Sequence, residues 1–599
     1  MRLMERVAGL VLMGCVLVGC GGDKDEAVVE EAGAGPVVVS EVDYAELPAI
    51  SDADWAMYNH DVAGWRFNSG ETVLNAENAA GLVEKWRFPM EGSSDRIGAV
   101  HGTPTVVNGY VYFGTATFPA FYKLRPDGTV AWVHDLGTGR ASVGSLPEGG
   151  RNLINAANGV LTSALVTDRG VYFGDSAGVF YCLDRLTGEE RWKVDTRDES
   201  FEGHHQANLF NASAILVDGK VIVGGGAYEH AHPLDPSYRC CVGRGFVLAF
   251  DPESGDVIWK YDVGEEPVWF DEPVVIEDAK GRHVFYGGPS TSSVWSTPSY
   301  DAASGTIFFG TDVHNSPRKP TADDPRYHSE YTAAVIAVDV ETGAEKWVTQ
   351  FNDGDIFNHT MSGYDPNTER YKDTSVGDTP KVYELEIDGE STTVVGVGCK
   401  NGGFYVMRAD TGEIVASTPV YGGPPVRPLD PEPDARMIAL PSTIGGIQTG
   451  VATDGERVYT NGIDWLSLNT NSPGWPEGGR VVSVSLGLEQ EFWRHERAQV
   501  LAPGYRGGDP VAAGVAVANG VVCFAPAVSE LLVVLNAETG EVLKELPIGT
   551  VWSGPSVSRG RVYIGTGSIL FLKRDVRGHV YSFGLPGEDE VDAMGSGNE

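Results

Sequence analysis

Residues 180–192 read FYCLDRLTGEERW, and this stretch contains the features that decide the fold. An apolar run leads to Asp184, a turn closes at Thr187-Gly188, and a second run reaches Trp192. The apolar run predicts one strand, the glycine supplies the positive φ that the turn needs, and the next strand buries its tryptophan. The stretch therefore predicts an antiparallel hairpin.

The same hairpin pattern recurs along the chain, and a second unit precedes it. That unit has the form small-Pro-x-Val-x-x-Gly-x-Val-Tyr-apolar-Gly, as in residues 103–114. Together the two units predict four short antiparallel strands per repeat. Successive tryptophans are spaced by roughly the 40–45 residues of a propeller blade plus inserted loops. The hairpin copies lead from Tyr122 to Trp132, Phe246 to Trp259, Val335 to Trp347, Phe404 to Gly412 and Leu531 to Gly540.

A single blade cannot bury either of its faces, so the blades must close into a ring. Counting tryptophan or Thr-Gly ends from Trp86 onward predicts about eight blades. The sequence thus predicts an all-β fold, a β-propeller of four-stranded antiparallel blades, over residues 51–585. Insertions rich in Asn, Gly and Pro predict loops gathered on one face, where a rigid scaffold would hold a site. These insertions are 133–158, 227–243, 311–330 and 416–442.

The N-terminus has the form of an export signal. Basic residues precede an apolar run, which ends in Leu-Val-Gly-Cys at Cys20. This ending resembles the bacterial lipobox, so we expect a signal peptide over 1–19 and a lipid on Cys20. Residues 20–50 predict a flexible acidic tether, and residues 586–599 a disordered tail. The expected location is a lipid-anchored position on a periplasm-facing or cell-surface membrane.

The charge composition limits the kinds of molecule that this protein is expected to bind. The chain has 44 basic and 83 acidic residues, a formal net charge of -39. This charge argues against binding to nucleic acid or to an anionic membrane surface, and it leaves a cationic protein as a partner. Five cysteines remain after Cys15 and Cys20, and the adjacent Cys240 and Cys241 are the one disulfide pair that sequence alone can name.

A series of short motifs then stands in order over roughly residues 52–570. The motifs are Trp55-x-x-Tyr58-x-His60-Asp61 with Arg66, Cys240-Cys241-x-x-Arg244-Gly245, Val294-Trp295-Ser296-Thr297-Pro298, Gly354-Asp355-x-x-Asn358, Lys400-Asn401-Gly402-Gly403 and Gly445-Gly446-Ile447-Gln448-x-Gly450. In this order they resemble the dehydrogenases that depend on pyrroloquinoline quinone (PQQ), most closely the polyvinyl alcohol dehydrogenase-like branch. The resemblance implies oxidation of alcohol groups, on small or polymeric substrates, by hydride transfer to PQQ.

A flat quinone needs an apolar plate on each side of its ring. The resemblance implies that Trp295 is one plate. In the alcohol dehydrogenases an adjacent-cysteine disulfide is the other plate, at a different point of their sequence, and the resemblance implies that Cys240 and Cys241 take that role here. The alternatives are a blade-core tryptophan like Trp259 and a chance cysteine pair.

The resemblance also implies a calcium ion. Calcium takes oxygen ligands, and beside PQQ it polarises the carbonyl that accepts hydride. Glu229, which follows a Gly-Gly-Gly strand end, matches the family's glutamate ligand; the alternative is a solvated loop residue. The family's asparagine follows a Thr-Gly end, whereas here Asp312 follows Thr311, so Asn315 and Asp312 compete for that role.

The reaction also needs a base for the hydroxyl proton. The family has an aspartate where this chain has Asn358. Either Asp355, three residues earlier, is the base, or catalysis uses another group, or no base survives. Lys400 matches the basic residue that contacts the quinone oxygens, where a cation would stabilise the negative charge of the reduced cofactor.

No Cys-x-x-Cys-His sequence occurs in the chain, so we expect no attached c-type haem. Electrons would then leave to a separate acceptor, and the acidic surface would suit a basic cytochrome c. The alternative functions are a cofactor-free scaffold, resembling the propeller lipoprotein of outer-membrane protein assembly, and a degenerate PQQ-like binding protein.

Overall fold

The computed structural model describes residue 44 and residues 47–587, apart from 138–158, 231, 236, 279–280, 291, 316–328, 359–363, 366–369, 372, 422–433, 442–443, 466–477, 498–506 and 570–574. Contacts divide the chain into Met1–Leu47 and Pro48–Glu599, and the fold below is that of the second unit. The expected signal peptide, the tether up to residue 43 and the tail from residue 588 lie outside the described residues. Within the described part of the chain, no helix is long and apolar enough to cross a membrane.

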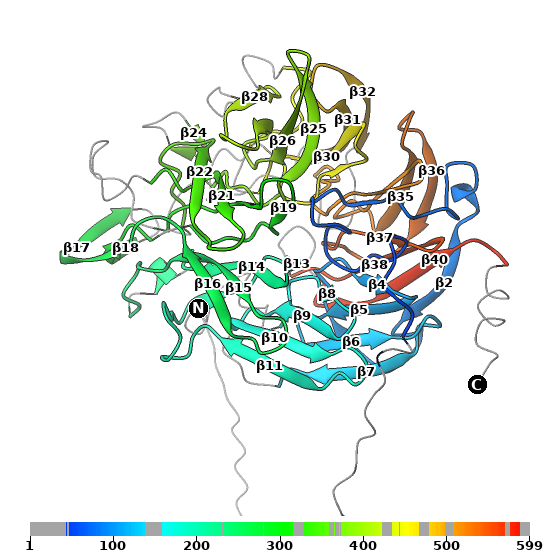
Figure 1. The fold of residues 1–599 in the computed structure, drawn as a ribbon, viewed down its shortest axis with the longest axis horizontal. Coiled ribbons are helices and arrows are strands. Elements are labelled where there is room, and N and C mark those ends of the chain that lie inside the picture. Colours follow the sequence, from blue (N-terminus) through cyan, green and yellow to red (C-terminus); the bar gives the residue numbers. More distant parts are fainter. Residues whose placement is uncertain are drawn as a thin grey trace, which may run out of the picture. The chain divides into compact units, whose positions relative to one another are not determined.

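Eight antiparallel sheets of four strands follow one another in sequence order, and we call them blades 1 to 8 (Figure 1). Blade 1 has β4 (Thr105–Val107), β5 (Tyr110–Gly114), β6 (Ala120–Leu124) and β7 (Val130–Asp135), and blade 2 has β8 (Leu165–Val166), β9 (Gly170–Gly174), β10 (Val179–Asp184) and β11 (Glu190–Asp195). Blade 3 has β13 (Ile215–Val217), β14 (Lys220–Ala227), β15 (Gly245–Phe250) and β16 (Val257–Asp262), and blade 4 has β19 (Ser299–Asp301), β20 (Thr306–Gly310), β21 (Ala334–Asp339) and β22 (Glu345–Gln350).

Blade 5 has β25 (Lys381–Ile387), β26 (Glu390–Gly398), β27 (Phe404–Arg408) and β28 (Ile414–Ser417), and blade 6 has β29 (Ala452–Thr453), β30 (Arg457–Asp464), β31 (Gly478–Ser485) and β32 (Glu491–Arg497). Blade 7 has β33 (Ala516–Ala518), β34 (Val521–Phe524), β35 (Leu531–Asn536) and β36 (Val542–Pro547), and blade 8 has β37 (Ser556–Ser558), β38 (Arg561–Gly565), β40 (Val580–Gly584) and β2 (Val83–Phe88). The predicted all-β propeller of about eight four-stranded blades is confirmed.

A few short elements supplement the blades. β12 (Asn208–Leu209) joins β14, and β1 (Phe67–Asn68) pairs in parallel with β33. Three pairs form small sheets of their own: β3 (Ile97–Gly98) with β39 (Arg577–Gly578), β17 (Val268–Asp278) with β18 (Gly281–Gly288), and β23 (Tyr364–Asp365) with β24 (Arg370–Tyr371). The described helical turns are η2 (Ala79–Gly81) and η4 (His232–Leu234).

The two ends of the propeller sequence close the ring. β2, from the start of the chain, is the outer strand of blade 8 and pairs with β40, from its end (Figure 1). The ladder between them satisfies backbone groups that an open sheet would leave unpaired. Closure therefore joins residues that lie about as far apart in the sequence as the propeller allows.

In six of the blades, the turn between the last two strands receives a tryptophan from the preceding blade. Trp192 Nε1 donates to the carbonyl oxygen of Pro252 at 3.1 Å, and a Cβ on Gly255 would lie 2.7 Å from the indole. Glycine is therefore favoured at position 255 for two reasons: its φ is positive, at 77°, and the absence of a Cβ leaves room for the indole ring. The other pairs of this kind are Trp86 with Gly128, Trp132 with Gly188, Trp259 with Gly343, Trp347 with Gly412 and Trp493 with Gly540.

Residues 55–68, which we call the inner strap, bond to the first strands of the blades. The strap contains the opening motif of the sequence, including the fully buried Arg66. Met57 packs against the clusters that contain β13 of blade 3. The strap therefore supports the ring from within. Its hydrogen bonds join Trp55 to Val106, Ala56 to Val166, Val62 to Tyr300, Ala63 to Val382, Trp65 to Thr453, Arg66 to Val517 and Asn68 to Val557.

Candidate cofactor site

Glu229 lies in the loop that follows β14 and is completely buried. Its carboxylate accepts hydrogen bonds from the Tyr238 hydroxyl at 2.8 Å and from the backbone N–H of Gly243 at 2.7 Å. His205 Nε2 lies 3.7 Å from the same carboxylate, and the backbone N–H of Glu229 donates to Asn315 Oδ1 at 3.1 Å. The alternative of a solvated loop residue is therefore wrong.

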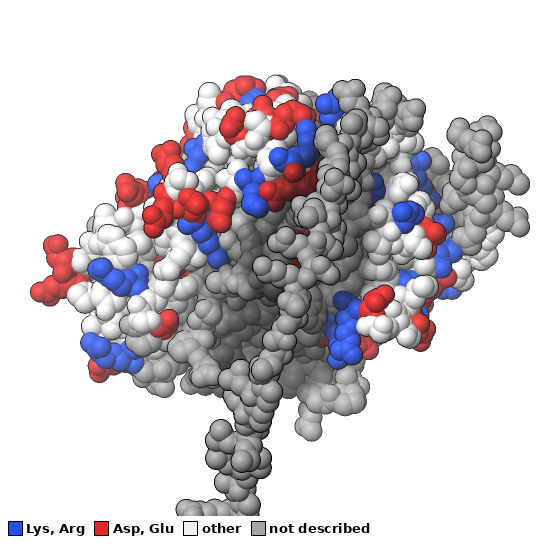
Figure 2. All heavy atoms as spheres, turned by 90° about the horizontal axis from the view of Figure 1, so that it is seen from below, with Lys and Arg blue, Asp and Glu red and all other residues white. Residues whose placement is uncertain are grey.

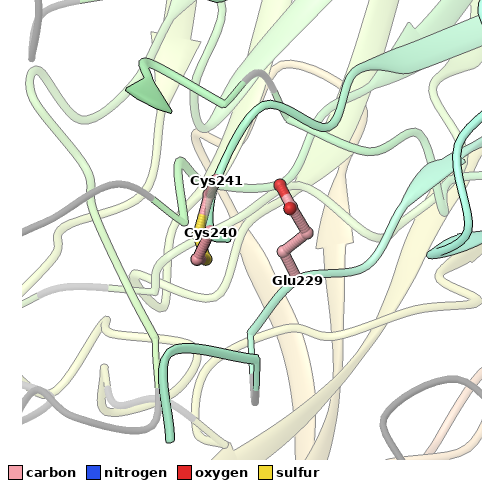
Figure 3. Close-up of side chains that lie close together, drawn as sticks. All are labelled: Glu229, Cys240 and Cys241. Carbon is pink, nitrogen blue, oxygen red and sulfur yellow. A yellow bond between two sulfur atoms is a disulfide. The ribbon is translucent and has the colours of Figure 1, made fainter. Parts of the chain in front are cut away.

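The cysteine pair lies beside this carboxylate. Cys240 and Cys241 form a disulfide and are both fully buried. One carboxylate oxygen of Glu229 and the two sulfur atoms all lie within 4.8 Å of one another (Figure 3). Cys241 Sγ also lies 3.4 Å from the backbone oxygen of Asn315. The structure thus brings Glu229, Asn315 and the disulfide into one place.

Asp312 lies near a different set of groups. Its Oδ2 lies 3.2 Å from Nε2 of His230 and accepts a hydrogen bond from the Ser293 hydroxyl at 3.1 Å. Burial alone would raise the pKa of Asp312, but His230 and Lys400 hold the pKa of this carboxyl below its usual value. Of the two candidates for the asparagine's role, Asn315 therefore lies next to Glu229, whereas Asp312 interacts with the charged residues around Lys400.

Lys400 contacts a carboxylate that the sequence reasoning missed. Its Nζ lies 2.6 Å from Oδ1 of Asp373, and both side chains are buried. The pKa of Asp373 is raised to about 7, because burial outweighs the opposing charge of Lys400 and nearby Asp312 adds to the increase. A buried carboxyl that titrates near neutrality is typical of a catalytic acid or base. In the sequence, the one feature that could have pointed to Asp373 is its position seven residues before Pro380, just ahead of β25.

Asp355 holds the segment that carries Asp373. Its Oδ1 accepts the backbone N–H of Asp373 at 2.7 Å, and its Oδ2 accepts the backbone N–H and the hydroxyl of Thr374. Asn358 is buried and donates from Nδ2 to the backbone oxygen of Asn315 at 3.2 Å. The role of Asp355 as base stays a prediction, and the geometry favours Asp373 for it.

Trp295 differs from the tryptophans of the blade interfaces. Its indole lies over Gly377, where a Cβ would come within 2.0 Å of the ring. Its Nε1 is buried and has no hydrogen-bond partner among the described residues. The same holds for the hydroxyls of Ser292 and Ser375, and the backbone oxygen of Ser375 accepts the N–H of Lys400 at 3.1 Å. A buried polar atom without a partner costs about 1–3 kcal/mol, so these three fit a site that a polar ligand completes.

Comparison of the sequence with known proteins assigns the chain to a family. The family model described as glucose/ethanol/alcohol dehydrogenase, β-propeller domain (PQQ) matches residues 55–421. This match covers more than half of the 599 residues, so the chain belongs to the PQQ-dependent dehydrogenase family. The resemblance seen in the sequence motifs is thereby confirmed.

Individual relatives agree with this assignment. A polyvinyl alcohol dehydrogenase of a Pseudomonas species is 27% identical over 409 residues, which are 67% of this chain and 54% of the relative. The quinohemoprotein alcohol dehydrogenase of Comamonas testosteroni is 25% identical over 608 residues, which are 91% of this chain and 78% of the relative. The chain thus spans about half of the length of the polyvinyl alcohol relatives that it matches.

Solved structures share the fold. The Comamonas testosteroni enzyme superposes with a TM-score of 0.63 at 19% identity, over 89% of this chain and 81% of that chain. A europium-containing methanol dehydrogenase superposes with a TM-score of 0.60 at 16% identity, over 89% of this chain and 98% of that chain. These similarities extend over nearly the whole propeller.

The residues present fit PQQ. Trp295 and the disulfide offer apolar surfaces, Lys400 offers a buried positive charge, and unpaired donors at Trp295, Ser292 and Ser375 can bind oxygen atoms. Glu229 and the side-chain oxygen of Asn315 are the hard ligands that calcium prefers. The site therefore has the donor set that a polyanionic quinone and a divalent cation require.

Proposed function

We propose that this protein is an exported, lipid-anchored oxidoreductase that oxidises alcohol groups with PQQ and calcium and passes the electrons to a separate acceptor. Family membership supports the reaction class. The observation that carries the proposal is the buried pair of Asp373 and Lys400, which interacts with Asp312 and with His230, the residue that follows Glu229. Export and the lipid on Cys20 rest on the N-terminal sequence alone.

In this proposal Trp295 and the Cys240–Cys241 disulfide would hold the two faces of PQQ, and Lys400 would pair with its oxygen atoms. Glu229 and Asn315 would bind the calcium ion, and Asp312 is the second candidate for the asparagine's place. When bound, PQQ accepts a hydride from the alcohol carbon, and the ion polarises the quinone carbonyl.

Asp373 would take the hydroxyl proton of the alcohol. A pKa of about 7 leaves a large share of this carboxyl ionised at neutral pH while keeping it basic enough to accept a proton. Asp355 holds the backbone of Asp373, and Lys400 stabilises the ionised form. The proposed base therefore lies on a different segment from Asn358.

The scaffold alternative has less support. At least six ionisable side chains lie buried in this region: Glu229, His230, Asp312, Asp355, Asp373 and Lys400. Burying charged groups is costly unless they are paired or used, so a protein that only presented its outer surface would have little need for them. This concentration of buried charge favours catalysis or ligand binding.

Reconstitution of the purified full-length protein with PQQ and calcium chloride tests the proposal. Quinone absorbance would report binding, and reduction of a phenazine dye would report turnover of small secondary alcohols and of polyvinyl alcohol. Failure to bind PQQ would favour the scaffold. Binding without turnover of any alcohol would favour a degenerate binding protein.

A further inference from the structure

Lys123 lies on β6 of blade 1 and is buried at the interface with blade 2. Its Nζ donates to the backbone oxygen of Arg185 at 2.9 Å and lies 4.6 Å from the centroid of the Tyr110 ring. Arg185 follows β10, in the turn that receives Trp132. Lys123 and Arg185 are 6% and 2% exposed, so two cations are buried together at one interface between blades.

The equivalent positions of the other tryptophan interfaces carry no charge. Lys123 is the register partner of Trp132, and the register partners of the five other interface tryptophans are Ser582, Cys182, Ala249, Ala337 and Ser483. Arg185 also replaces an apolar residue. The residues whose backbone oxygen accepts the indole N–H elsewhere are Pro126, Pro252, Val340, Ala409 and Ala537. Five interfaces of this kind therefore form without either cation.

A tyrosine hydroxyl at this interface also lacks a partner. Tyr172 of blade 2 has the position that Tyr112 has in blade 1, and its hydroxyl donates to the oxygen of Pro252 at 3.1 Å. In blade 1 the corresponding oxygen, that of Arg185, accepts from Lys123 instead. The Tyr112 hydroxyl is buried without a hydrogen-bond partner among the described residues. The pKa of Tyr112 is raised to about 12, because burial outweighs the opposing effect of nearby Arg185, so the phenol stays a neutral donor.

Neither cation forms an ion pair with a carboxylate in the described part of the chain. Nη1 of Arg185 is buried and has no hydrogen-bond partner there. Asp184 is the carboxyl that acts on Lys123, and its Oδ1 accepts the backbone N–H groups of Leu186 and Thr187. The pKa of Lys123 is lowered to about 8, because burial and the charge of Arg185 outweigh the opposing effect of Asp184. Figure 2 shows the opposite arrangement on one face of the surface, where Lys and Arg lie beside Asp and Glu.

Two buried cations without an anion are costly, because a buried charge needs a partner of opposite sign. A guanidinium, an ammonium and a hydroxyl together are the donors that bind oxyanions well. A phosphate group carries about two negative charges at neutral pH, enough to balance both cations. We propose that Lys123, Arg185 and Tyr112 form a binding site for a phosphate-class oxyanion between blades 1 and 2. Because both cations are almost completely covered, the site suits the free ion rather than the phosphate group of a larger molecule.

The bound ion would join two blades. Lys123 and Tyr112 belong to blade 1, and Arg185 belongs to blade 2. A ligand that binds only the folded protein stabilises it by mass action, so the ion would strengthen one interface of the ring. The site contains none of the residues assigned to PQQ or calcium and therefore goes beyond the proposed function.

Calorimetric titration of the full-length protein with sodium phosphate tests this site, in a chloride buffer near neutral pH at constant ionic strength. Sulfate, acetate and glycerol phosphate are the comparison ligands. We expect phosphate and sulfate to bind saturably, one ion per chain, and acetate and glycerol phosphate to bind about tenfold more weakly or less. The absence of saturable phosphate binding would overturn the proposal. Equal affinity for acetate would overturn the doubly charged ligand, and equal affinity for glycerol phosphate would overturn the free ion.

Two variants give this interface the residues that other interfaces have. Lys123→Ala copies Ala249, and Arg185→Val copies Val340. Each should weaken phosphate binding by about tenfold or more, because each removes a charge-assisted contact. Without phosphate, each should unfold at the same temperature as the original protein or a higher one, because an unpaired buried cation is gone. A lower Tm together with an unchanged Kd for phosphate would show that the cations are structural and overturn the proposal.

The matched control is Arg191→Ala, at the neighbouring interface between blades 2 and 3. Arg191 has a carboxylate of its own, since its Nη2 lies 2.6 Å from Oε2 of Glu253. The control should leave the Kd for phosphate within about twofold of the original, because it removes a cation that is already paired. Weakening equal to that of Lys123→Ala would overturn the site. These titrations use neither PQQ nor an alcohol, so their result stands apart from the outcome of the dye assay.

Discussion

Trp259, at a blade interface, and Trp295, in the candidate cofactor site, differ in whether the indole N–H has a hydrogen-bond partner. Trp259 Nε1 donates to the carbonyl oxygen of Val340 at 2.9 Å, and its ring packs on Gly343. Trp295 packs on Gly377 and leaves its Nε1 buried without a partner among the described residues. The blade interfaces thus complete their own hydrogen bonds, whereas the site leaves donors for a ligand. Stability and function should therefore respond to different substitutions.

The largest effect should come from the site. We expect Asp373→Asn to lower kcat by about 100-fold to 10,000-fold while PQQ still binds, because the amide cannot take the proton. Stopped-flow reduction of the bound quinone by an alcohol would measure it. The control is Asn358→Asp in the same background, which should not restore turnover. Restored turnover would move the base to position 358.

The two tryptophans provide a direct comparison. Trp259→Ala should lower the free energy of unfolding by about 3–5 kcal/mol, since it removes a buried ring and its hydrogen bond. Trp295→Ala should cost less stability and abolish PQQ binding. Urea denaturation and quinone titration of both variants measure the difference. An unchanged affinity of Trp295→Ala for PQQ would show that Trp295 does not contact the cofactor.

A pH profile sharpens the assignment of the base. Because the pKa of Asp373 is raised to about 7, the ionised form is lost as pH falls through 7. We expect kcat/KM to be level above this pH and to fall about tenfold per pH unit below it. The stability of the fold should change with pH in the opposite direction. Because the pKa of Asp373 is higher in the folded than in the unfolded protein, the contribution of Asp373 to the free energy of unfolding falls as pH rises from about 4 to 7. An acid limb that persists unchanged in Asp373→Asn would contradict the assignment.

The turn glycines test the interfaces without touching the site. Gly343→Ala should lower the free energy of unfolding by about 1–3 kcal/mol, because its φ is 69° and the new Cβ would lie 2.7 Å from the Trp259 ring. Gly219, with a φ of 71° and nothing within 4 Å, is the matched control for backbone strain alone. Equal losses in the two variants would mean that the indole adjusts freely.

The smallest effect should come from an interface that lacks the tryptophan. Between blades 5 and 6 the hydroxyl of Tyr383 donates to the carbonyl oxygen of Leu486 at 3.1 Å, in the turn position that receives an indole elsewhere. Tyr383→Phe should therefore cost about 1 kcal/mol in urea denaturation. No loss would show that apolar packing alone holds this interface.

The last interface shows why the repeat could not predict everything. Blade 8 has no turn between its two outer strands, because β40 and β2 come from opposite ends of the chain. Lys544 of β36 instead donates to the oxygen of Ala80 at 3.0 Å. A local pattern identifies hairpins, but it cannot identify contacts that arise only when a ring closes.

By itself, the amino-acid sequence determined the strands, the hairpin turns and the number of blades, since each depends on residues near one another along the chain. It also pointed to Glu229, Trp295, Lys400 and the cysteine pair through short motifs. Only the tertiary structure decided that Asp373 meets Lys400, that Asp355 holds the backbone of Asp373 and that Glu229 lies beside the disulfide. These relations depend on burial and on charges from distant segments, which no local pattern encodes.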